Sequence, residues 1–275
     1  CRIKVPLSIK YSQLGYESTR GIFIGSNRYQ NKEKAPSCFT QFKPMSETRF
    51  TAVSHIIMDL DGIVLDTAGY YFEAHMKYLL KYKKRYTSEL KINSIGISDE
   101  DAAKYLIEQL DLPMTPSVYA HGVWQDLRTN FPKSKIMDGA KELICHLHNN
   151  HIPIALATST NTRSFELKTK NHKEILKYFC HIVKGDDPEI KHGKPAPDIY
   201  QVTAKRFNNA PQDPIKYLVI EDSAIGIQAA KAAGMQAVLV PDQAIPKELL
   251  KGKADLIVNS LKAIDLRDFD LPRIE

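Results

Sequence analysis

Apolar runs and helical patterns alternate along most of the chain from about residue 53 onward. The apolar runs are short and rich in β-branched residues: HIIMDL, IPIALATS, HIVKGD, YLVIED, QAVLVP and DLIVNS. Runs of this kind are typical of strands that are buried on both faces of a sheet. Most of them are separated by segments with apolar residues at helical spacing, such as GAKELICHLHNN. The alternation predicts an α/β fold in which a parallel sheet carries helices on both faces.

One stretch interrupts this alternation, between Thr67 and about Pro132. It shows amphipathic helical patterns and no convincing strand; the patterns are AHMKYLLKY, DEDAAKYLIEQLDL and VYAHGVWQDLRTNF. An insertion after the first strand would lie over the carboxyl ends of the strands, where open α/β sheets bind ligands. We therefore predict a core formed by residues 53–67 and 134–275, and an inserted all-helical cap at 68–133.

The first fifty residues differ from the rest in pattern and in charge. They are polar, contain Gly, Ser, Asn and Pro, and show no sustained period of 2 or 3.6. They hold nine Lys/Arg and three acidic residues, which accounts for the whole net charge of +6. Because the remainder is neutral, the charge does not indicate a nucleic-acid partner. We predict that residues 1–52 are a disordered or artefactual extension, with a mitochondrial transit peptide as the alternative.

Cysteine spacing and the length of the apolar runs limit which compartments and partners we expect. No apolar run approaches the ~20 residues that span a bilayer. The four cysteines, Cys1, Cys38, Cys145 and Cys180, are scattered and form no CxxC pair, which favours a reducing compartment over a disulfide scaffold. We therefore expect a cytoplasmic monomer without a membrane partner, and keep a mitochondrial location as the alternative.

Charged and hydroxyl side chains stand where the predicted strands end. Two acids follow the first strand, hydroxyls end the second, a lysine lies beyond the third, and two more acids follow the fourth. In chain order these residues are Asp59, Asp61, Thr158, Ser159, Lys194, Glu221 and Asp222. The carboxyl ends of parallel strands share one edge of a sheet, so the acids would lie close together and repel one another. A Mg²⁺ ion would offset this repulsion and bind a substrate phosphate.

This set of side chains predicts phosphoryl transfer. Asp59 could attack phosphorus to form an aspartyl-phosphate. Asp61 could protonate the leaving oxygen and then take a proton from the hydrolytic water. Thr158, Ser159 and Lys194 would bind the phosphoryl oxygens, and Lys194 would also temper the charge of Asp59.

Four motifs in this order, DLDGIVLDT, LATST, HGKPAPD and VIEDS, resemble those of the haloacid dehalogenase superfamily of phosphohydrolases. The resemblance covers about residues 53–260. The segments between and around these motifs, including LPMTPSVY and AAGMQAVLVPD, are similar to the animal pseudouridine-5'-phosphatase group. The resemblance implies a Rossmann-like core, a helical cap, dependence on Mg²⁺ and a nucleoside monophosphate substrate.

The resemblance also implies roles for individual residues. Asp59 matches the nucleophile and Asp61 the proton donor. Asp59, the backbone carbonyl of Asp61, and Asp222 match the magnesium ligands, with Glu221 supporting them. Thr158 and Lys194 match the residues that bind the phosphate.

The chain departs from the group in the predicted cap. Ala68 and Gly69 follow LDT where the group usually has Glu, and Ile97 and Ser98 stand where it tends to have a basic residue. Both changes bear on substrate choice and leave the phosphoryl chemistry intact.

Several alternatives stay open at this point. A sugar-phosphate phosphatase or a phosphomutase would keep all four motifs, and a non-catalytic binding protein would keep the scaffold. Asp66 and Thr67 could cap the first cap helix or serve the site. Trp124 is more often a core residue at such a position than a platform for a base.

Overall fold

The computed structural model describes residues 49–242, 245, 250, 252 and 254–274, so most of the predicted 1–52 extension lies outside the described residues. Within the described part, six parallel strands form one sheet in the order β5-β4-β1-β6-β7-β8. Their bounds are β1 His55–Met58, β4 Ile154–Thr158, β5 Ile182–Lys184, β6 Tyr217–Glu221, β7 Gln236–Leu239 and β8 Leu256–Ile257. Each strand lies within an apolar run of the sequence, which confirms the predicted α/β fold.

The middle of the sheet brings three strand ends together. β1 lies between β4 and β6, and Met58 at its end pairs with Leu156 on one side and Ile220 on the other. All the residues of β1, β4 and β6 are buried. This explains why their sequences are continuously apolar instead of alternating.

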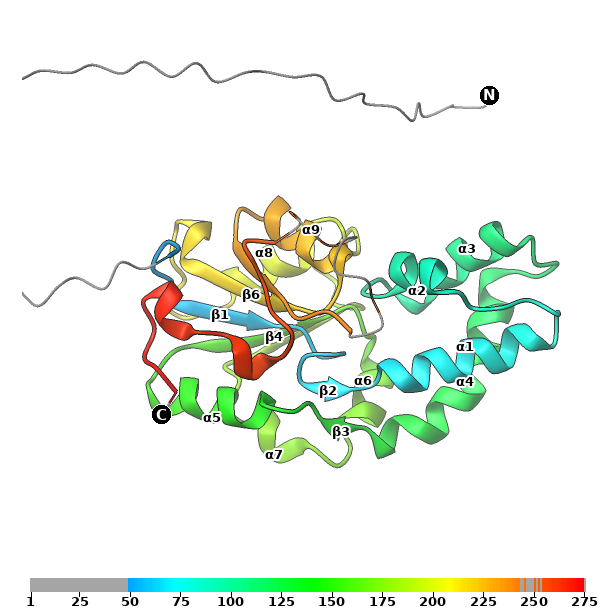
Figure 1. The fold of residues 1–275 in the computed structure, drawn as a ribbon, viewed down its shortest axis with the longest axis horizontal. Coiled ribbons are helices and arrows are strands. Elements are labelled where there is room, and N and C mark those ends of the chain that lie inside the picture. The colour runs from blue at the N-terminus through cyan, green and yellow to red at the C-terminus, as the bar shows by residue number, and fades with distance from the viewer. Residues whose placement is uncertain (1–48, 243–244, 246–249, 251, 253, 275) are drawn as a thin grey trace, which may run out of the picture. The chain divides into compact units, whose positions relative to one another are not determined.

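Helices cover both faces of the sheet (Figure 1). One face packs against α5 (Ala140–Asn149), α7 (Lys173–Leu176), η4 (Leu261–Ala263) and η5 (Leu266–Phe269). The other face packs against α8 (Asp198–Lys205) and α9 (Ala224–Ala232). Helix α9 ends where Gly234 takes a φ of +79°, a conformation that glycine adopts without strain.

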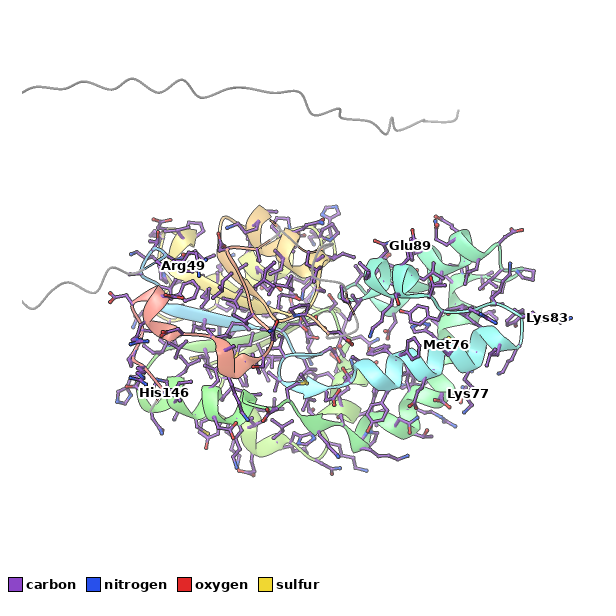
Figure 2. All side chains as sticks on the ribbon, in the orientation of Figure 1. Arg49, Met76, Lys77, Lys83, Glu89 and His146 are labelled. Carbon is purple, nitrogen blue, oxygen red and sulfur yellow. The ribbon has the colours of Figure 1, made fainter. Side chains whose placement is uncertain are left out.

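A group of helices between β2 and β3 forms the cap, by which we mean α1–α4. The helices are α1 Ala68–Leu80, α2 Ser88–Ser94, α3 Asp99–Leu110 and α4 Pro116–Asn130. They share an apolar core of their own that includes Leu79, Leu106, Tyr119 and Phe131. Figure 1 shows β1 pointing toward the cap, and Figure 2 shows Lys83 at the end of the cap remote from the sheet.

Helix α2 was not predicted from the sequence. It is short and polar, SELKINS, so it lacks a full amphipathic period. The side chain of Thr87 starts it by accepting a hydrogen bond from the Leu90 N–H. The same device starts α3, where Ser98 accepts from Asp101, and α4, where Thr115 accepts from Val118.

Two short strands tie the cap to the core. β2 (Leu65–Asp66) pairs antiparallel with β3 (Lys135–Ile136), so the chain enters and leaves the cap side by side. After the cap, η1 (Phe131–Lys133) leads back to the core, where α6 (Thr162–Lys168) and η2 (Pro214–Lys216) complete the elements. No helix among the described residues combines the length and the apolar character that a membrane crossing needs.

The core begins earlier than the predicted boundary at residue 53. The Phe50 ring stacks on the Phe269 ring with centroids 4.9 Å apart, and the Phe50 N–H donates to the Asp268 carbonyl. The sequence pattern missed this contact because one aromatic residue shows no periodicity.

Candidate active site

The acids and the lysine of the sequence prediction converge at the carboxyl end of the sheet. Asp59 directly follows β1, Thr158 ends β4, and Asp222 directly follows β6. These three side chains line one pocket together with Asp61 and Ser159. Lys194 is buried beside them, so the set predicted from four separate parts of the sequence forms one site.

Lys194 connects the two acidic strand ends. Its ammonium donates to the Asp59 carboxylate at 2.7 Å and to the Glu221 carboxylate at 2.5 Å. Glu221 is fully buried and also accepts from the Tyr200 hydroxyl at 2.6 Å and from the Ser223 N–H and hydroxyl. Glu221 therefore does not face the pocket; it holds Lys194 and the turn that follows β6.

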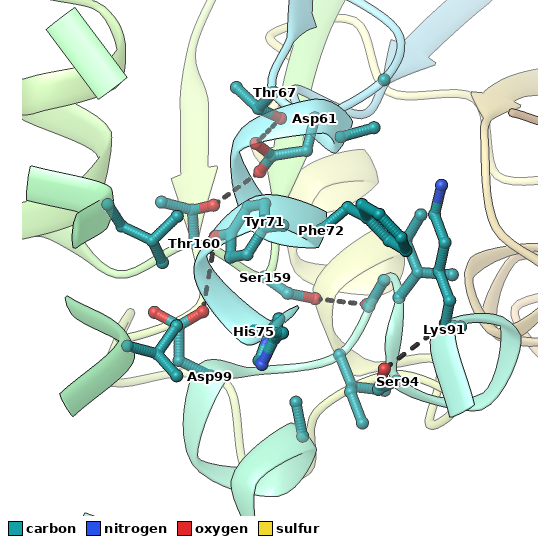
Figure 3. A pocket seen from close by; sticks show the side chains of 18 of the residues that line it. Asp61, Thr67, Tyr71, Phe72, His75, Lys91, Ser94, Asp99, Ser159 and Thr160 are labelled. Atoms are coloured by element: carbon teal, nitrogen blue, oxygen red, sulfur yellow. Dashed lines mark hydrogen bonds between the residues drawn. The ribbon is translucent and has the colours of Figure 1, made fainter. Parts of the chain in front are cut away.

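Asp61 is held by three donors from three parts of the chain, of which Figure 3 draws Thr67 and Thr160. The Thr67 hydroxyl donates to its Oδ1 at 2.6 Å, and the Thr160 hydroxyl donates to its Oδ2 at 2.7 Å. The Lys168 ammonium contacts both oxygens, at 2.7 and 2.8 Å. Thr67 occupies the N-cap position of α1 but makes no side-chain cap bond, because its hydroxyl points to Asp61.

Sequence reasoning missed Thr160 and Lys168. Lys168 looks like one of several surface lysines in ELKTKNHK, yet its side chain is 0% exposed. The available signal was its place on the same side of a short helix as Ser164 and Phe165, both of which are buried.

The hydroxyls at the end of β4 divide between the core and the cap. The Thr158 hydroxyl oxygen accepts a hydrogen bond from the Thr160 N–H at 3.1 Å. The Ser159 hydroxyl donates to the Gly96 carbonyl of the cap at 2.9 Å (Figure 3). Lys91 of α2 also bridges to the core, with its ammonium 2.6 Å from Asp242. The cap is therefore bonded to the core on the pocket side.

The electrostatics of the site favour the binding of a cation. Burial, with Glu221 and Asp61 nearby, raises the pKa of Asp59 to about 7, although Lys194 opposes the shift. Burial and the neighbouring acids raise the pKa of Asp222 well above its ordinary value. Among the described residues, four carboxylates meet two ammonium groups here: Asp59, Asp61, Glu221 and Asp222 against Lys168 and Lys194. A divalent cation would balance this excess.

The donor set fits magnesium in charge and in the chemistry of its oxygen ligands. No three acidic, histidine or cysteine side chains in the described ranges gather as a ready cluster, so side chains alone would not form a cage. Asp59 and Asp222 supply two carboxylates. The turn after Asp61 lies directly against the Asp222 side chain at Gly62. Gly62 there has a φ of +71°, and a Cβ on it would lie 2.3 Å from Asp222 Oδ2. Two carboxylates and a backbone carbonyl, with water completing the shell, suit Mg²⁺.

The pocket above these acids is lined by both the core and the cap, and its cavity volume is about 90 Å³. The cap contributes a largely aromatic wall: Tyr71, Phe72, His75, Tyr86, Tyr119 and Trp124. The Tyr86 hydroxyl bonds to Ser94 at 2.7 Å, and His75 Nδ1 lies 2.9 Å from the Tyr119 hydroxyl. Burial lowers the pKa of His75 to about 4, so its ring is neutral.

The cap residues singled out in the sequence take different places. Ile97 lines the pocket, while Ser98 serves as the N-cap of α3. Trp124 lines the pocket and packs on Phe131, and the Arg163 guanidinium lies over its ring at 4.5 Å. One face of the indole is therefore already covered.

Comparison with known proteins identifies the family of the chain. Residues 56–240 match the family described as haloacid dehalogenase-like hydrolase. The chain is 39% identical over 229 residues to (DL)-glycerol-3-phosphatase 2 of Arabidopsis thaliana, which covers 82% of this chain and 94% of the relative. It is also 39% identical over 221 residues to a probable pseudouridine-5'-phosphatase of Drosophila melanogaster, over 80% of this chain and 95% of the relative.

A solved structure shares the fold. The β-phosphoglucomutase of Clostridium difficile superposes with a TM-score of 0.64 at 25% identity, over 78% of this chain and 94% of that one. The four motifs occur in the matched region, their side chains form one site, and the relatives are phosphatases by name. The chain therefore belongs to the haloacid dehalogenase-like hydrolase family and is a phosphoric monoester hydrolase.

Proposed function

We propose that this protein is a Mg²⁺-dependent phosphomonoesterase that works through an aspartyl-phosphate intermediate. The observation that carries the proposal is the floor of the pocket, where Asp59 and Asp61 lie side by side. The Asp61 N–H donates to Asp59 Oδ2 at 3.0 Å, which orients the Asp59 carboxylate against the Asp61 backbone. A nucleophile and a proton donor held together at the base of a capped pocket suit the cleavage of a phosphate ester.

Each step falls to a residue of the chain. Asp59 attacks phosphorus as the bond to the leaving oxygen breaks, and Asp61 gives that oxygen a proton so that an alcohol leaves. Asp61 then takes a proton from the water that attacks the aspartyl-phosphate, which releases phosphate and restores Asp59. Thr158 and Lys194 bind the phosphoryl oxygens. A Mg²⁺ held by Asp59, Asp222 and the Asp61 carbonyl would neutralise charge on the phosphate when bound.

The pocket suits a substrate whose leaving group carries no charge. Lys91, which lines the pocket, is paired with Asp242. Lys168, which lies behind Asp61, is paired with Asp61, so neither ammonium is left to attract an acidic leaving group. The cap adds a carboxylate, Asp99, which would repel an acidic leaving group. An uncharged leaving group with several hydroxyls or ring N–H groups meets no such penalty.

Pseudouridine-5'-phosphate is the leading candidate within this class. The aromatic wall of the cap suits a flat base, and Asp99 offers an acceptor for the extra ring N–H of pseudouridine. A site that bonds this N–H would discriminate against uridine-5'-phosphate, which lacks it.

Glycerol-3-phosphate is the second candidate. Its leaving group, glycerol, is an uncharged alcohol with two further hydroxyls and so meets no repulsion from Asp99. The 39% identity to a plant glycerol-3-phosphatase supports the same choice.

Substrate profiling tests the proposal and separates the candidates. We expect phosphate release from a panel of esters in the presence of Mg²⁺, with kcat/KM higher for pseudouridine-5'-phosphate than for uridine-5'-phosphate. A preference for glycerol-3-phosphate by more than about tenfold would favour the second candidate and leave the phosphatase intact. Conversion of glucose-1-phosphate to glucose-6-phosphate without phosphate release would indicate a mutase instead.

The remaining expectations concern the setting of the enzyme. We propose a cytoplasmic monomer with no partner beyond its substrate. Cys145 and Cys180 are both free thiols, which suits a reducing compartment. Size-exclusion chromatography with light scattering checks the oligomeric state.

A further inference from the structure

We propose that Lys168 is a positioning residue for Asp61, and that Tyr71 makes this positioning depend on the cap. The inference rests on the proposed function in one respect: Asp61 is taken as the proton donor to the leaving oxygen. Lys168 lies outside the four motifs, and its three N–H donors are all taken by protein partners, so it acts through Asp61 and not on the substrate.

Lys168 is buried with every donor engaged. Its side chain is 0% exposed. Its three N–H groups have three partners: Asp61 at 2.7–2.8 Å, the Thr160 hydroxyl at 2.8 Å and the Tyr71 hydroxyl at 2.9 Å. The ammonium also lies over the rings of Tyr71 and Phe131, 4.9 and 4.7 Å from their centroids. Because all of its donors are engaged, the Lys168 ammonium is held in one position, and it restricts the Asp61 carboxylate that it contacts.

The contacts restrict the rotation of the Asp61 carboxylate. Lys168 touches both oxygens, Thr67 fixes Oδ1, and Thr160 fixes Oδ2. All of these contacts donate to the carboxylate, so they hold its ionised form, the form that takes a proton from the hydrolytic water. They also set the plane of the carboxylate, which proton transfer to or from a defined oxygen requires.

Tyr71 extends the network into the cap. Its hydroxyl accepts from Lys168 and donates to Asp99 Oδ1 at 3.4 Å, a bond that Figure 3 draws, so the chain of contacts runs from Asp61 through Lys168 to α1 and α3. Without the cap in this position, Lys168 loses one of its three acceptors. The geometry therefore links the placement of Asp61 to the placement of the cap.

Leaving-group dependence tests the role of Lys168. Phenyl phosphate and 4-nitrophenyl phosphate have similar shapes, but phenolate is the stronger base and needs the proton from Asp61 more. In Lys168→Met, which fills the space between two rings with an apolar chain, kcat/KM should fall about tenfold further for phenyl phosphate than for 4-nitrophenyl phosphate. Equal losses for the two esters would show a structural role and overturn the proposal.

Tyrosine variants provide a second test of the network, which can be used if Lys168→Met does not fold. Tyr71→Phe removes the cap acceptor, and the ratio of the two kcat/KM values should shift in the same direction by about threefold. Tyr86→Phe is the matched control, since its hydroxyl bonds to Ser94 in the same pocket and does not touch Lys168. It should leave the ratio within about twofold of wild type. The same ratio in both tyrosine variants would overturn the link to the cap.

Asp61→Asn separates this inference from the proposed function. If Asp61 is the proton donor, Asp61→Asn alone shifts the ratio, and adding Lys168→Met shifts it no further. If Asp61→Asn leaves the ratio unchanged, the assignment of Asp61 as the donor is wrong. If it shifts the ratio while Lys168→Met does not, only the positioning role fails.

Discussion

The edge of the sheet and the wall of the cap meet at one pocket, but they are built differently. At the edge, Asp59, Thr158 and Asp222 stand at or next to the end of a strand, and buried charges fix one another, as Lys194 does with Asp59 and Glu221. In the cap, the pocket side chains come from the four helices and the loops between them, and they include several aromatic rings that pack on their neighbours. The edge is suited to one chemistry, whereas the wall can change without disturbing it.

This difference predicts how substitutions should behave. Changes at the edge should abolish turnover of every ester, because all of them share the phosphoryl group. Changes in the cap should alter which ester is used, or the stability of the cap, because packing there decides shape more than charge.

The largest effect is expected for Asp59→Asn. The amide keeps the shape but cannot attack phosphorus, so kcat should fall by at least about a thousandfold for every ester tested. Asp66→Asn is the matched control, an exposed aspartate on β2 that should retain full turnover. Residual activity above about a tenth of wild type in Asp59→Asn would mean that the nucleophile is another residue.

Metal removal comes next. Chelation should abolish activity and Mg²⁺ should restore it, while Ca²⁺ should support turnover poorly because it prefers more ligands in a looser geometry. In Asp222→Asn, half-maximal activity should require about tenfold more Mg²⁺ or worse, since one of two carboxylates is lost. Full activity of wild type in excess chelator would remove magnesium from the mechanism.

The edge could be predicted from the sequence because its information is local. Asp59, Thr158 and Asp222 each stand at the end of a recognisable apolar run, and parallel strands bring such ends together. The pattern of apolar runs and helical segments also predicted the core and the place of the inserted cap in the chain. Neither prediction depends on how the helices pack.

The residues around that edge could not be predicted, because their roles arise only from tertiary contacts. Helical spacing places Lys168 on the side of Ser164 and Phe165, but only the fold shows that its ammonium is buried against Asp61. Thr67 has the sequence signature of a helix cap, but in the fold its hydroxyl points to Asp61. Helix α2 is too short and polar to show a period.

A smaller, pH-dependent effect should separate the cap from the edge. Burial lowers the pKa of His75 to about 4, so the folded protein binds fewer protons than the unfolded chain between pH 6.5 and 4. Stability attributable to His75 is therefore present above pH 6.5 and lost as pH falls through this range, by roughly 3 kcal/mol in total.

His75→Gln provides the measurement, because glutamine can still bond to the Tyr119 hydroxyl but does not titrate. Between pH 7 and 5 the Tm of the wild type should fall several degrees more than that of the variant. Parallel Tm curves for the two proteins would mean that His75 is not buried in its neutral form.

The smallest effect is expected at the start of the described core, outside both regions. A shortened chain that begins at Ser46 should match the full chain in kcat/KM and in Tm, because the first fifty residues show no apolar periodicity. A chain that begins at Thr51 loses the Phe50–Phe269 ring contact and the hydrogen bond to Asp268. It should lose about 1 kcal/mol of stability, a few degrees in Tm, while kcat/KM stays the same. A fall in kcat/KM in either shortened chain would show that the N-terminal residues act on the pocket. Equal Tm values for the two chains would show instead that the Phe50 contact contributes nothing measurable to the core.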